Sequence, residues 1–466
     1  MMLRNKLISL AGGLLLLAIG TMVIGPVPSL AQGNYSTGHY SMAGGRGTLP
    51  NDIDAALVNP ALLAMPGRRS FSFRFLSGTV HLDQNLISKA RWNSWQGAFI
   101  NSEMKKEFLD SLGDFARVTA LTEVSTLGIQ IGPFALGAYH MVDVEARLPK
   151  DLFDLVLNGN QFNRTYNFGD FGVNSESVSV IHASYGFKLP INAESYLPMT
   201  IVPVRELYAG VGLKYYMGHQ YAGIEDGLVD LTFTESGIYG NAFYSYRSAG
   251  LPGGLVDDDS DDPAVVADST FGGIAGRGFG IDLGIAGVIN DQVSFHVGLL
   301  NLSPGISWNK STYEITLTAS ADTIGLGTTW ELDDEAEQTD LDSLTTSESD
   351  VTKIGSFTTP VPVILRMGTT LQYGKTTFNI EIEQALTRGM GYNLMPRLGL
   401  GIECRLLSML PLRAGLSLGG RHGLVGAVGF GLDLRAIVWD FGIANTGLTP
   451  GGIKGIGVST GLKISF

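Results

Sequence analysis

The chain has little cysteine, little charge and, beyond its first residues, no long hydrophobic run. Cys404 is the only cysteine of 466 residues, which excludes an intramolecular disulfide and a metal site built from several cysteines. The 31 Lys and Arg residues are outnumbered by 44 Asp and Glu residues. Nucleic acid is therefore not an expected partner, because phosphate binding needs a concentrated basic surface. A bundle of membrane helices is also excluded, because each spanning helix needs about 20 consecutive apolar residues.

The N-terminus is the exception, and it has the three parts of a secretion signal. Arg4 and Lys6 are basic, residues 7–24 are apolar, and Ser29-Leu30-Ala31 provides a small-x-small cleavage site. We therefore predict a signal peptide at residues 1–31. Because the apolar part is long, an uncleaved membrane anchor is the alternative.

Much of the remaining chain alternates between apolar residues and small or polar ones, which is the pattern of a β-strand with two different faces. In the last stretch, residues 454–466, Ile456, Val458 and Leu462 alternate with glycine, serine and lysine. Similar segments of about 10 residues, the length of a membrane-spanning strand, recur along the chain. The 62 glycines suit a sheet with small residues on one face. A tight turn at Gly132-Pro133 indicates that neighbouring strands are antiparallel.

Charged residues in these segments fall on the face opposite the apolar side chains. On an outer wall each Arg or Lys at mid-bilayer would cost about 2 to 4 kcal/mol, whereas inside a barrel charges can pair or meet water. We therefore predict an all-β fold, a transmembrane antiparallel β-barrel of about 14 strands with a lumen wide enough for charge. A secreted soluble β-sandwich is the alternative. The expected lumen charges are Arg366, Glu381, Glu383, Glu403, Arg405, Arg413, Asp433 and Arg435.

Four segments do not follow the strand pattern. Residues 101–117 and 149–160 have apolar residues at helical spacing, and we expect both to be short helical excursions at the barrel rim. Residues 257–262 combine five aspartates with a serine. We favour a solvated loop there over a Ca²⁺ site, because EF-hand spacing is missing. Residues 331–350 contain no basic residue and are expected to form a long loop.

The sequence contains no arrangement that supports catalysis or metal binding. Gly415-x-Ser417-x-Gly419 and Gly457-x-Ser459-x-Gly461 match the nucleophile motif of hydrolases. That motif works only at a strand-to-helix turn, and both matches lie inside alternating segments. The 7 histidines are scattered, with no helical pair and no cysteine partner. We therefore predict that the protein is not an enzyme and that it needs no cofactor or metal ion.

The segment RGTLPNDIDAALVNPALLAMPGRRSFSF resembles the N-terminal part of outer-membrane transporters of the FadL-like superfamily. In that superfamily a glycine-rich run, an acidic Ala-rich turn and an Asn-Pro-Ala motif precede the first strand and lie in the barrel as a plug. The resemblance implies a plug at residues 32–68 and a barrel at residues 69–466. It also implies a plug motif made of Asn59, Pro60 and Ala61.

Two other parts of the chain resemble the same kind of protein. Ser459, Gly461, Ile464 and Phe466 are similar to the C-terminal sorting signal that the barrel-assembly machinery of Gram-negative outer membranes recognises. Blocks such as GFGIDLGIAGVIND and KGIGVSTGLKISF resemble an uncharacterised family of FadL-like barrels more than they resemble the transporters themselves.

These resemblances imply an outer-membrane location and passive uptake of hydrophobic small molecules, with the plug moving to open a path. The expected partners are outer-membrane lipid, the barrel-assembly machinery and a hydrophobic small-molecule ligand. The alternative is a barrel that transports nothing and acts as a structural, secretion or surface-attachment partner, as some FadL-like proteins do in type IX systems. An apolar pocket between the plug motif and the wall would favour transport.

Overall fold

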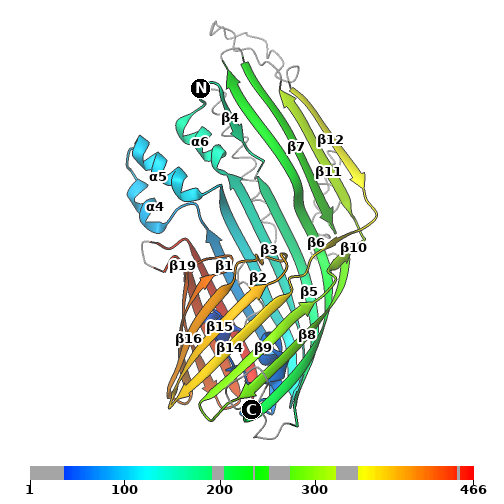
Figure 1. The fold of residues 1–466 in the computed structure, drawn as a ribbon, viewed down its shortest axis with the longest axis vertical. Coiled ribbons are helices and arrows are strands. Elements are labelled where there is room, and N and C mark those ends of the chain that lie inside the picture. Colours follow the sequence, from blue (N-terminus) through cyan, green and yellow to red (C-terminus); the bar gives the residue numbers. More distant parts are fainter. Residues whose placement is uncertain are drawn as a thin grey trace.

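The alternating segments form one antiparallel sheet that closes on itself. The computed structural model describes residues 36–169, 171–190, 204–234, 237–250, 273–321, 345–448 and 452–466. The first wall strand, β1, hydrogen-bonds to β2 on one side and to the last strand, β20, on the other, so the sheet is a barrel. Its 14 wall strands confirm the predicted all-β fold (Figure 1). In order they are β1 (Phe71–Gln84), β2 (Phe115–Ile131), β3 (Phe134–Pro149), β5 (Gly172–Lys188), β6 (Glu206–Thr234), β8 (Gly276–Val288), β9 (Val293–Leu302), β14 (Ile364–Tyr373), β15 (Thr376–Ala385), β16 (Arg397–Leu407), β17 (Leu410–Gly419), β18 (Val425–Leu434), β19 (Ile437–Thr446) and β20 (Gly455–Ser465).

The two ends of the barrel differ in the length of their connections. At one end, which we call the short-turn end, Gly132-Pro133 joins β2 to β3 and Gly374-Lys375 joins β14 to β15. Gly132 and Gly374 have φ angles of 56° and 58°, which an L residue rarely adopts, so glycine permits both turns. The C-terminus lies at this end (Figure 1). The connection between β5 and β6, residues 189–205, is an exception at this end. The opposite end, the long-loop end, carries the other long connections and the helices that lie outside the lumen.

The two faces of the wall differ in polarity along each strand. Ile380 and Leu400 point outward with 51% and 45% of their surface exposed, whereas Glu381 on the opposite face of β15 is 0% exposed. The same alternation runs along β14 to β20, where exposed Leu, Ile, Val and Phe side chains cover the outside. Such a wall suits hydrocarbon outside and polar contacts inside, as expected for a transmembrane barrel. Within the described residues, none of the helices is long and apolar enough to cross a membrane.

A second group of strands continues beyond the long-loop end. β6 is 29 residues long, and its second half leaves the wall to pair with β7 (Gly237–Ala249). β7 pairs in turn with β11 (Tyr313–Ala321), and β11 with β12 (Thr345–Lys353), which gives a sheet that projects from the barrel (Figure 1). The remaining short strands are β4 (Arg164–Asn167), β10 (Ile306–Trp308) and β13 (Phe357–Thr359).

One predicted loop is partly a strand. Residues 345–350, expected to belong to a long acidic loop, form the first part of β12 because their backbone groups pair with β11. The backbone of β11 thus provides a partner that the composition of this segment does not reveal. Residues 331–344, and the aspartate-rich segment 257–262, lie outside the described residues.

The helices α4 (Lys89–Trp95), α5 (Ser102–Leu112) and α6 (Lys150–Asn158) lie at the long-loop end (Figure 1). Helices α5 and α6 lie at the two predicted rim excursions, although the first ends before residue 117 because residues 115–117 already pair in β2, and α4 was not predicted. The Oδ1 atom of Asn101 caps α5 by accepting a hydrogen bond from the Met104 amide at 2.9 Å. Phe108 and Leu112 are buried against residues of α6 and the wall, so the apolar stripe packs within the protein.

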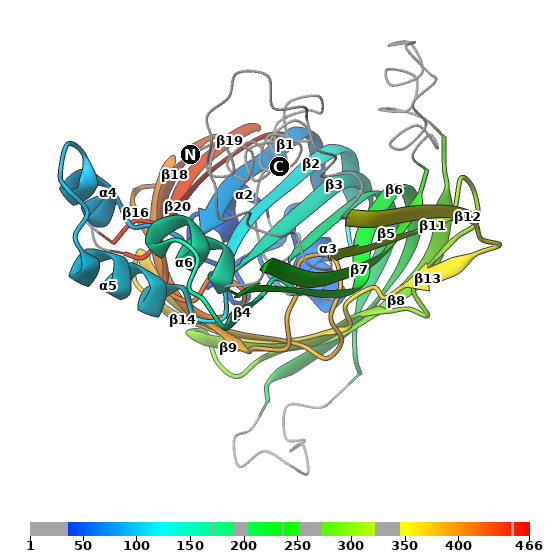
Figure 2. The ribbon, with the colours of Figure 1, turned by 90° about the horizontal axis from the view of Figure 1, so that it is seen from above.

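The N-terminal segment lies inside the barrel (Figure 2). Its elements are α2 (Thr37–Tyr40), α3 (Ala55–Val58) and the 3₁₀ helix η1 (Pro60–Ala64). Nearly all of residues 36–65, which we call the plug, are buried. The FadL-like resemblance implies a barrel with an inserted N-terminal segment, and this chain has both. The predicted signal peptide at residues 1–31 lies outside the described residues.

Candidate binding chamber above the plug

The plug motif attaches the plug to strands β8 and β9. Asn59 Nδ2 donates hydrogen bonds to the backbone carbonyls of Ile285, at 3.2 Å, and Val297, at 2.9 Å. Asn59 Oδ1 accepts from the amide of Ala61 at 2.9 Å and caps η1, which has Pro60 in its first turn. One side chain therefore starts the 3₁₀ helix and binds the wall.

Wall glycines allow the plug backbone to lie directly on the sheet. A Cβ on Gly210 would come within 2.3 Å of the Ala61 amide nitrogen, and a Cβ on Gly415 within 2.2 Å of the Met42 backbone. Side chains at these positions would displace the plug. Inward-facing glycines thus mark where the plug lies, and these contacts leave no space for a ligand between Asn59-Pro60-Ala61 and the wall. The pocket that transport predicts is not at the plug motif.

A second attachment centres on Asp54 of the plug. Its carboxylate binds Lys463 of β20 at 2.8 Å, Arg46 of the plug at 3.3 Å, and Arg74 of β1. Burial alone would raise the pKa of the Asp54 carboxyl, but these three cations outweigh burial and hold that pKa well below its ordinary value. Asp54 is therefore a carboxylate shared by three cations, two of which belong to the wall.

A third attachment centres on Glu381 and Glu383 of β15. Arg366 Nε lies 3.1 Å from Glu383 Oε2, and Arg397 Nε lies 3.3 Å from Glu383 Oε1. The two arginines also donate to plug carbonyls, Arg366 to Leu57 and Arg397 to Ala43. Glu381 accepts a hydrogen bond from the Gly47 amide at 3.1 Å, and its other oxygen lies 3.1 Å from His39 Nε2. Three of the predicted lumen charges, Arg366, Glu381 and Glu383, thus belong to this attachment.

Two more predicted lumen charges pair within the wall. Arg413 Nε donates to Glu403 at 2.7 Å, and Arg413 Nη1 donates to Asp440 at 2.6 Å. Both Glu403 and Arg413 are buried on the inner face.

The last three predicted lumen charges lie at the short-turn end. Arg405 is half-exposed and donates to Glu403 at 2.7 Å, and Asp433 accepts from Arg69 at 2.6 Å. Arg435 is not a lumen residue. It lies exposed in the turn between β18 and β19 with a φ of 65°, because β18 ends one residue earlier and the alternation stops there.

The residues of the predicted sorting signal belong to β20 or follow it directly. Ser459 and Gly461 face the lumen, where Ser459 Oγ lies 2.8 Å from Thr79 Oγ1 and 3.0 Å from Thr37 Oγ1 of the plug. Ile464 lies toward the outside, and Phe466 stacks on Phe71 with ring centroids 5.2 Å apart. The last strand therefore offers an apolar outer face that ends in an exposed aromatic ring.

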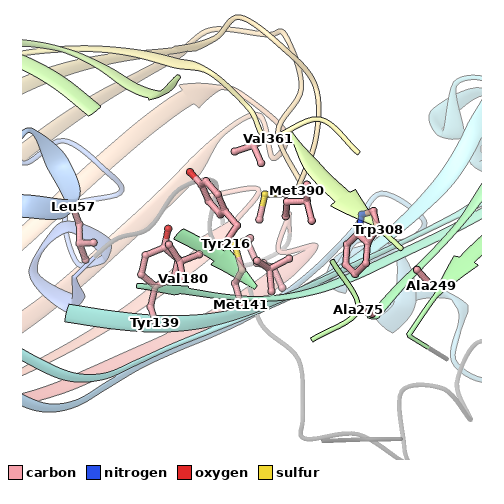
Figure 3. Packing of buried hydrophobic residues seen from close by; sticks show 13 residues of the cluster. Leu57, Tyr139, Met141, Val180, Tyr216, Ala249, Ala275, Trp308, Val361 and Met390 are labelled. Carbon is pink, nitrogen blue, oxygen red and sulfur yellow. The ribbon is translucent and has the colours of Figure 1, made fainter. Parts of the chain in front are cut away.

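An apolar chamber lies beyond the plug, toward the long-loop end. It contains 13 buried hydrophobic residues from the wall, the plug, β7, β10 and the connections that precede β8, β14 and β16 (Figure 3). Leu57 of α3 belongs to the plug, so the plug forms one side of the chamber. At the far side the Trp308 indole donates to Thr359 Oγ1 at 2.9 Å. The chamber residues are Leu57, Leu121, Tyr139, Met141, Val178, Val180, Tyr216, Ala249, Ala275, Ile306, Trp308, Val361 and Met390.

The side chains nearly fill this chamber. A cavity of about 30 Å³, room for about two water molecules, remains between Leu57, Tyr139, Tyr216 and their neighbours. Polar groups reach the same cavity. Lys214 binds Asp282 at 2.8 Å, so its charge is matched within the wall. A hydrophobic molecule could occupy this site only after side chains move.

The chamber does not follow from the strand alternation, although the sequence contains one signal of it. Tyr215, Tyr216 and Met217 are consecutive in β6, so both faces of the strand are apolar there. Such a break in the alternation marks a strand whose inner face also packs on apolar groups. Residues such as Leu57 and Met390 come from segments with no strand pattern.

The two Gly-x-Ser-x-Gly matches lie in ordinary wall positions. Ser417 and Ser459 occur within β17 and β20, and neither stands at a turn from a strand to a helix. In the described ranges, no group of three or more His, Cys, Asp or Glu side chains is arranged to hold a metal ion.

Three solved structures illustrate what this chain is similar to. The toluene transporter TbuX of Ralstonia pickettii is 11% identical with a TM-score of 0.45, and the match covers 93% of this chain and 98% of that one. The toluene transporter TodX of P. putida is 12% identical with a TM-score of 0.47, covering 94% and 99%. The monoaromatic hydrocarbon channel CymD is 11% identical with a TM-score of 0.45, covering 93% and 98%. At this similarity, function has to come from the chain's own residues.

No curated protein matches the sequence significantly. Residues 59–438 match the model of the Family of unknown function (DUF5723). The matched region begins at the plug motif and includes all wall strands from β1 to β18, so it is most of the chain. The resemblance to an uncharacterised barrel family therefore holds, and the chain belongs to the family of unknown function DUF5723.

Proposed function

We propose that this chain is a bacterial outer-membrane barrel, exported with a signal peptide at residues 1–31, that takes up small hydrophobic molecules passively. The observation that carries the proposal is the apolar chamber in the lumen. Barrel lumens that conduct ions and polar solutes are lined by polar side chains and water. A cluster of thirteen buried hydrophobic residues at the long-loop end of the lumen suits an apolar guest better than a polar one.

The plug controls the exit from the chamber in this proposal. Leu57 borders the cavity, and the carbonyl of the same residue accepts a hydrogen bond from Arg366 of the wall. Below it the plug backbone lies directly against wall glycines such as Gly210 and Gly415, which narrows the way past the plug. A molecule held beside Leu57 therefore reaches the short-turn end only if the plug rearranges.

A disulfide between plug and wall tests this proposal. Thr48 Oγ1 lies 2.5 Å from Ser294 Oγ of β9, so cysteines at both positions are close enough to form a disulfide. The double variant Thr48→Cys/Ser294→Cys would be made with Cys404→Ser, which removes the native thiol. In liposomes, uptake of p-xylene should be normal when the pair is reduced and at least tenfold slower when it is oxidised.

The matched controls are the two single-cysteine variants, which should not respond to oxidation. Uptake that is equal in both redox states would show that the plug does not gate the path. If the reduced barrel admits no p-xylene above the rate of empty liposomes, the proposed function itself is wrong.

A partner role without transport is the second candidate, and the projecting sheet favours it. Leu317 and Val351 lie on one face of this sheet and are 45% and 41% exposed, and Leu228, on the other face, is 55% exposed. A protein involved in secretion or surface attachment would contact this sheet and leave the chamber unused. Replacing all three residues with serine would then remove the partner, while uptake of p-xylene would remain unchanged.

The remaining parts of the proposal concern partners and chemistry. Membrane lipid would cover the apolar outer wall. The assembly machinery would recognise β20 through Ser459, Gly461, Ile464 and Phe466, and the exposed Phe466 ring is accessible for such a contact. We assign the barrel no catalytic role and no cofactor. Its proposed task is passage, for which the chamber provides an apolar site.

A further inference from the structure

One acidic side chain faces the apolar chamber. Glu123 projects from β2 into the lumen, is 7% exposed, and lines the same cavity as Tyr139 and Tyr216. Its neighbours two positions away on the strand differ in character: Leu121 belongs to the apolar chamber, and Ser125 is polar. Glu123 therefore lies at the boundary between the apolar chamber and the polar part of the lumen around the plug. We call that polar part, which extends from the chamber to the short-turn end, the lower lumen.

The Glu123 carboxyl has weaker partners than the other charges beside the cavity. It accepts one hydrogen bond, from Ser125 Oγ at 3.4 Å, near the upper limit of length for such a bond. Lys214 has Asp282 at 2.8 Å, and Arg366 has Glu383 at 3.1 Å. Among the described residues, no ion pair to Glu123 is formed.

A buried carboxyl with one long hydrogen bond is costly, because the oxygen atoms lose water and gain little in return. Buried polar groups in folded proteins usually have good partners, so an exception calls for a reason. A ligand that brings a hydrogen-bond donor to the cavity would supply the missing partner.

The other residues that line the cavity indicate that the rest of such a ligand is apolar. Leu57, Met141, Val361 and Met390 line the cavity with apolar groups. Methionine side chains are flexible and adapt to the shape of a guest, so a cavity of about 30 Å³ can widen where Met141 and Met390 move. The site thus combines an adaptable apolar lining with one carboxyl group, that of Glu123.

We propose that the chamber selects apolar molecules that carry one hydrogen-bond donor, such as a phenol, over hydrocarbons of the same size, and that Glu123 makes this distinction. The inference rests on the proposed uptake function and specifies its substrate class. A site that hydrogen-bonds a ligand hydroxyl discriminates strongly against the analogue that lacks it, because the buried group is then left unpaired.

Two ligands of nearly equal shape test the proposal. p-Cresol and p-xylene differ in one hydroxyl against one methyl group. Uptake into liposomes and binding to the purified barrel by equilibrium dialysis should both favour p-cresol, after correction for partition into lipid, by roughly fivefold or more. Glu123→Leu should abolish this preference, and Glu123→Gln, which keeps a hydrogen-bonding group, should retain part of it.

Glu176 of β5 provides the matched control. It is another glutamate of the barrel, but it accepts a hydrogen bond from Thr359 at 3.1 Å and does not line the cavity. Glu176→Leu should therefore keep the preference for p-cresol. Circular dichroism and the resistance of the barrel to detergent would verify that each variant is folded.

The possible outcomes separate this inference from the function on which it rests. Equal uptake of both compounds by the unaltered barrel, or a preference that survives in Glu123→Leu, would overturn the role of Glu123 and leave hydrophobic uptake standing. If neither compound enters above the background of empty liposomes, the proposed function fails and this inference fails with it.

Discussion

The lower lumen and the chamber are built by the same strands but in opposite ways. In the lower lumen Asp54, Glu381 and Glu383 each have at least two polar partners, and the plug backbone rests on wall glycines. In the chamber Trp308 and its neighbours are held by apolar contacts, and Glu123 accepts one long hydrogen bond. The first region is held by paired charges and tight packing. The second is apolar and contains a cavity.

This difference shows where the molecule is fixed and where it can adapt. Buried charges hold a structure in one arrangement, because removing one partner leaves the other unpaired in a medium of low polarity. Apolar side chains, and methionine above all, can exchange one packing for another at lower cost. We infer that a guest enters by rearranging the chamber, and that the lower lumen sets the energy barrier to its exit.

The largest effect is expected from removing the shared carboxylate of the plug. In Asp54→Ala, Lys463, Arg74 and Arg46 lose a buried partner, which should destabilise the docked plug by about 3 to 5 kcal/mol. Trypsin cleavage after Arg46, followed by mass spectrometry, measures plug release. The control Asp110→Ala breaks an exposed pair with Lys106 and should change nothing. An Asp54→Ala plug as protected as the unaltered one would contradict the fixed lower lumen.

A smaller effect is expected from adding a side chain under the plug. In Gly210→Val the new Cβ would come within 2.3 Å of the Ala61 amide, so the plug or the strand must shift at a cost of about 1 to 3 kcal/mol. The same protease assay reports it. Gly78 of β1 faces outward, and a Cβ added there would meet no atom within 4 Å, so Gly78→Val is the matched control. Equal protection in both variants would mean that the glycines do not serve the plug.

A change in stability of about the same size as that of Gly210→Val is expected in the chamber. Met141→Ala removes a buried side chain beside the cavity and should cost about 2 kcal/mol, near the lower limit for such a change, because flexible neighbours fill part of the space. Uptake of p-xylene should become several-fold faster, since less packing has to move. Met217→Ala, on the outer face of β6, is the control for methionine loss alone. Slower uptake in Met141→Ala would argue against an adaptable chamber.

Much of the wall could be predicted from local pattern. The alternation in β15 and β16 placed Glu381, Glu383 and Glu403 on one face, because side chains of a strand alternate and a wrong face would put charge in hydrocarbon. The turn at Gly132-Pro133 followed from its composition. Both required only neighbouring residues.

The predictions that were wrong or missing concern positions where the strand alternation ends or does not apply. Arg435 follows the alternation of charged residues in the sequence, but β18 ends at Leu434 and β19 begins at Ile437. The side chain of a residue in this two-residue turn does not belong to the inner or the outer face of the wall. Residues 345–350 have the composition of a loop, yet β11 offers their backbone a partner. The chamber combines positions from Leu57 to Met390, which no local window can connect.

The sequence by itself determined that the strands have one apolar and one polar face, since that property belongs to each strand separately, and this favoured a membrane barrel over a soluble sandwich. Only the tertiary structure decided which inward glycines lie under the plug, which charges bind it, and that Glu123 opens onto an apolar cavity. These features depend on distances between segments that are remote in the chain, and such distances exist only once the barrel has closed around its N-terminus.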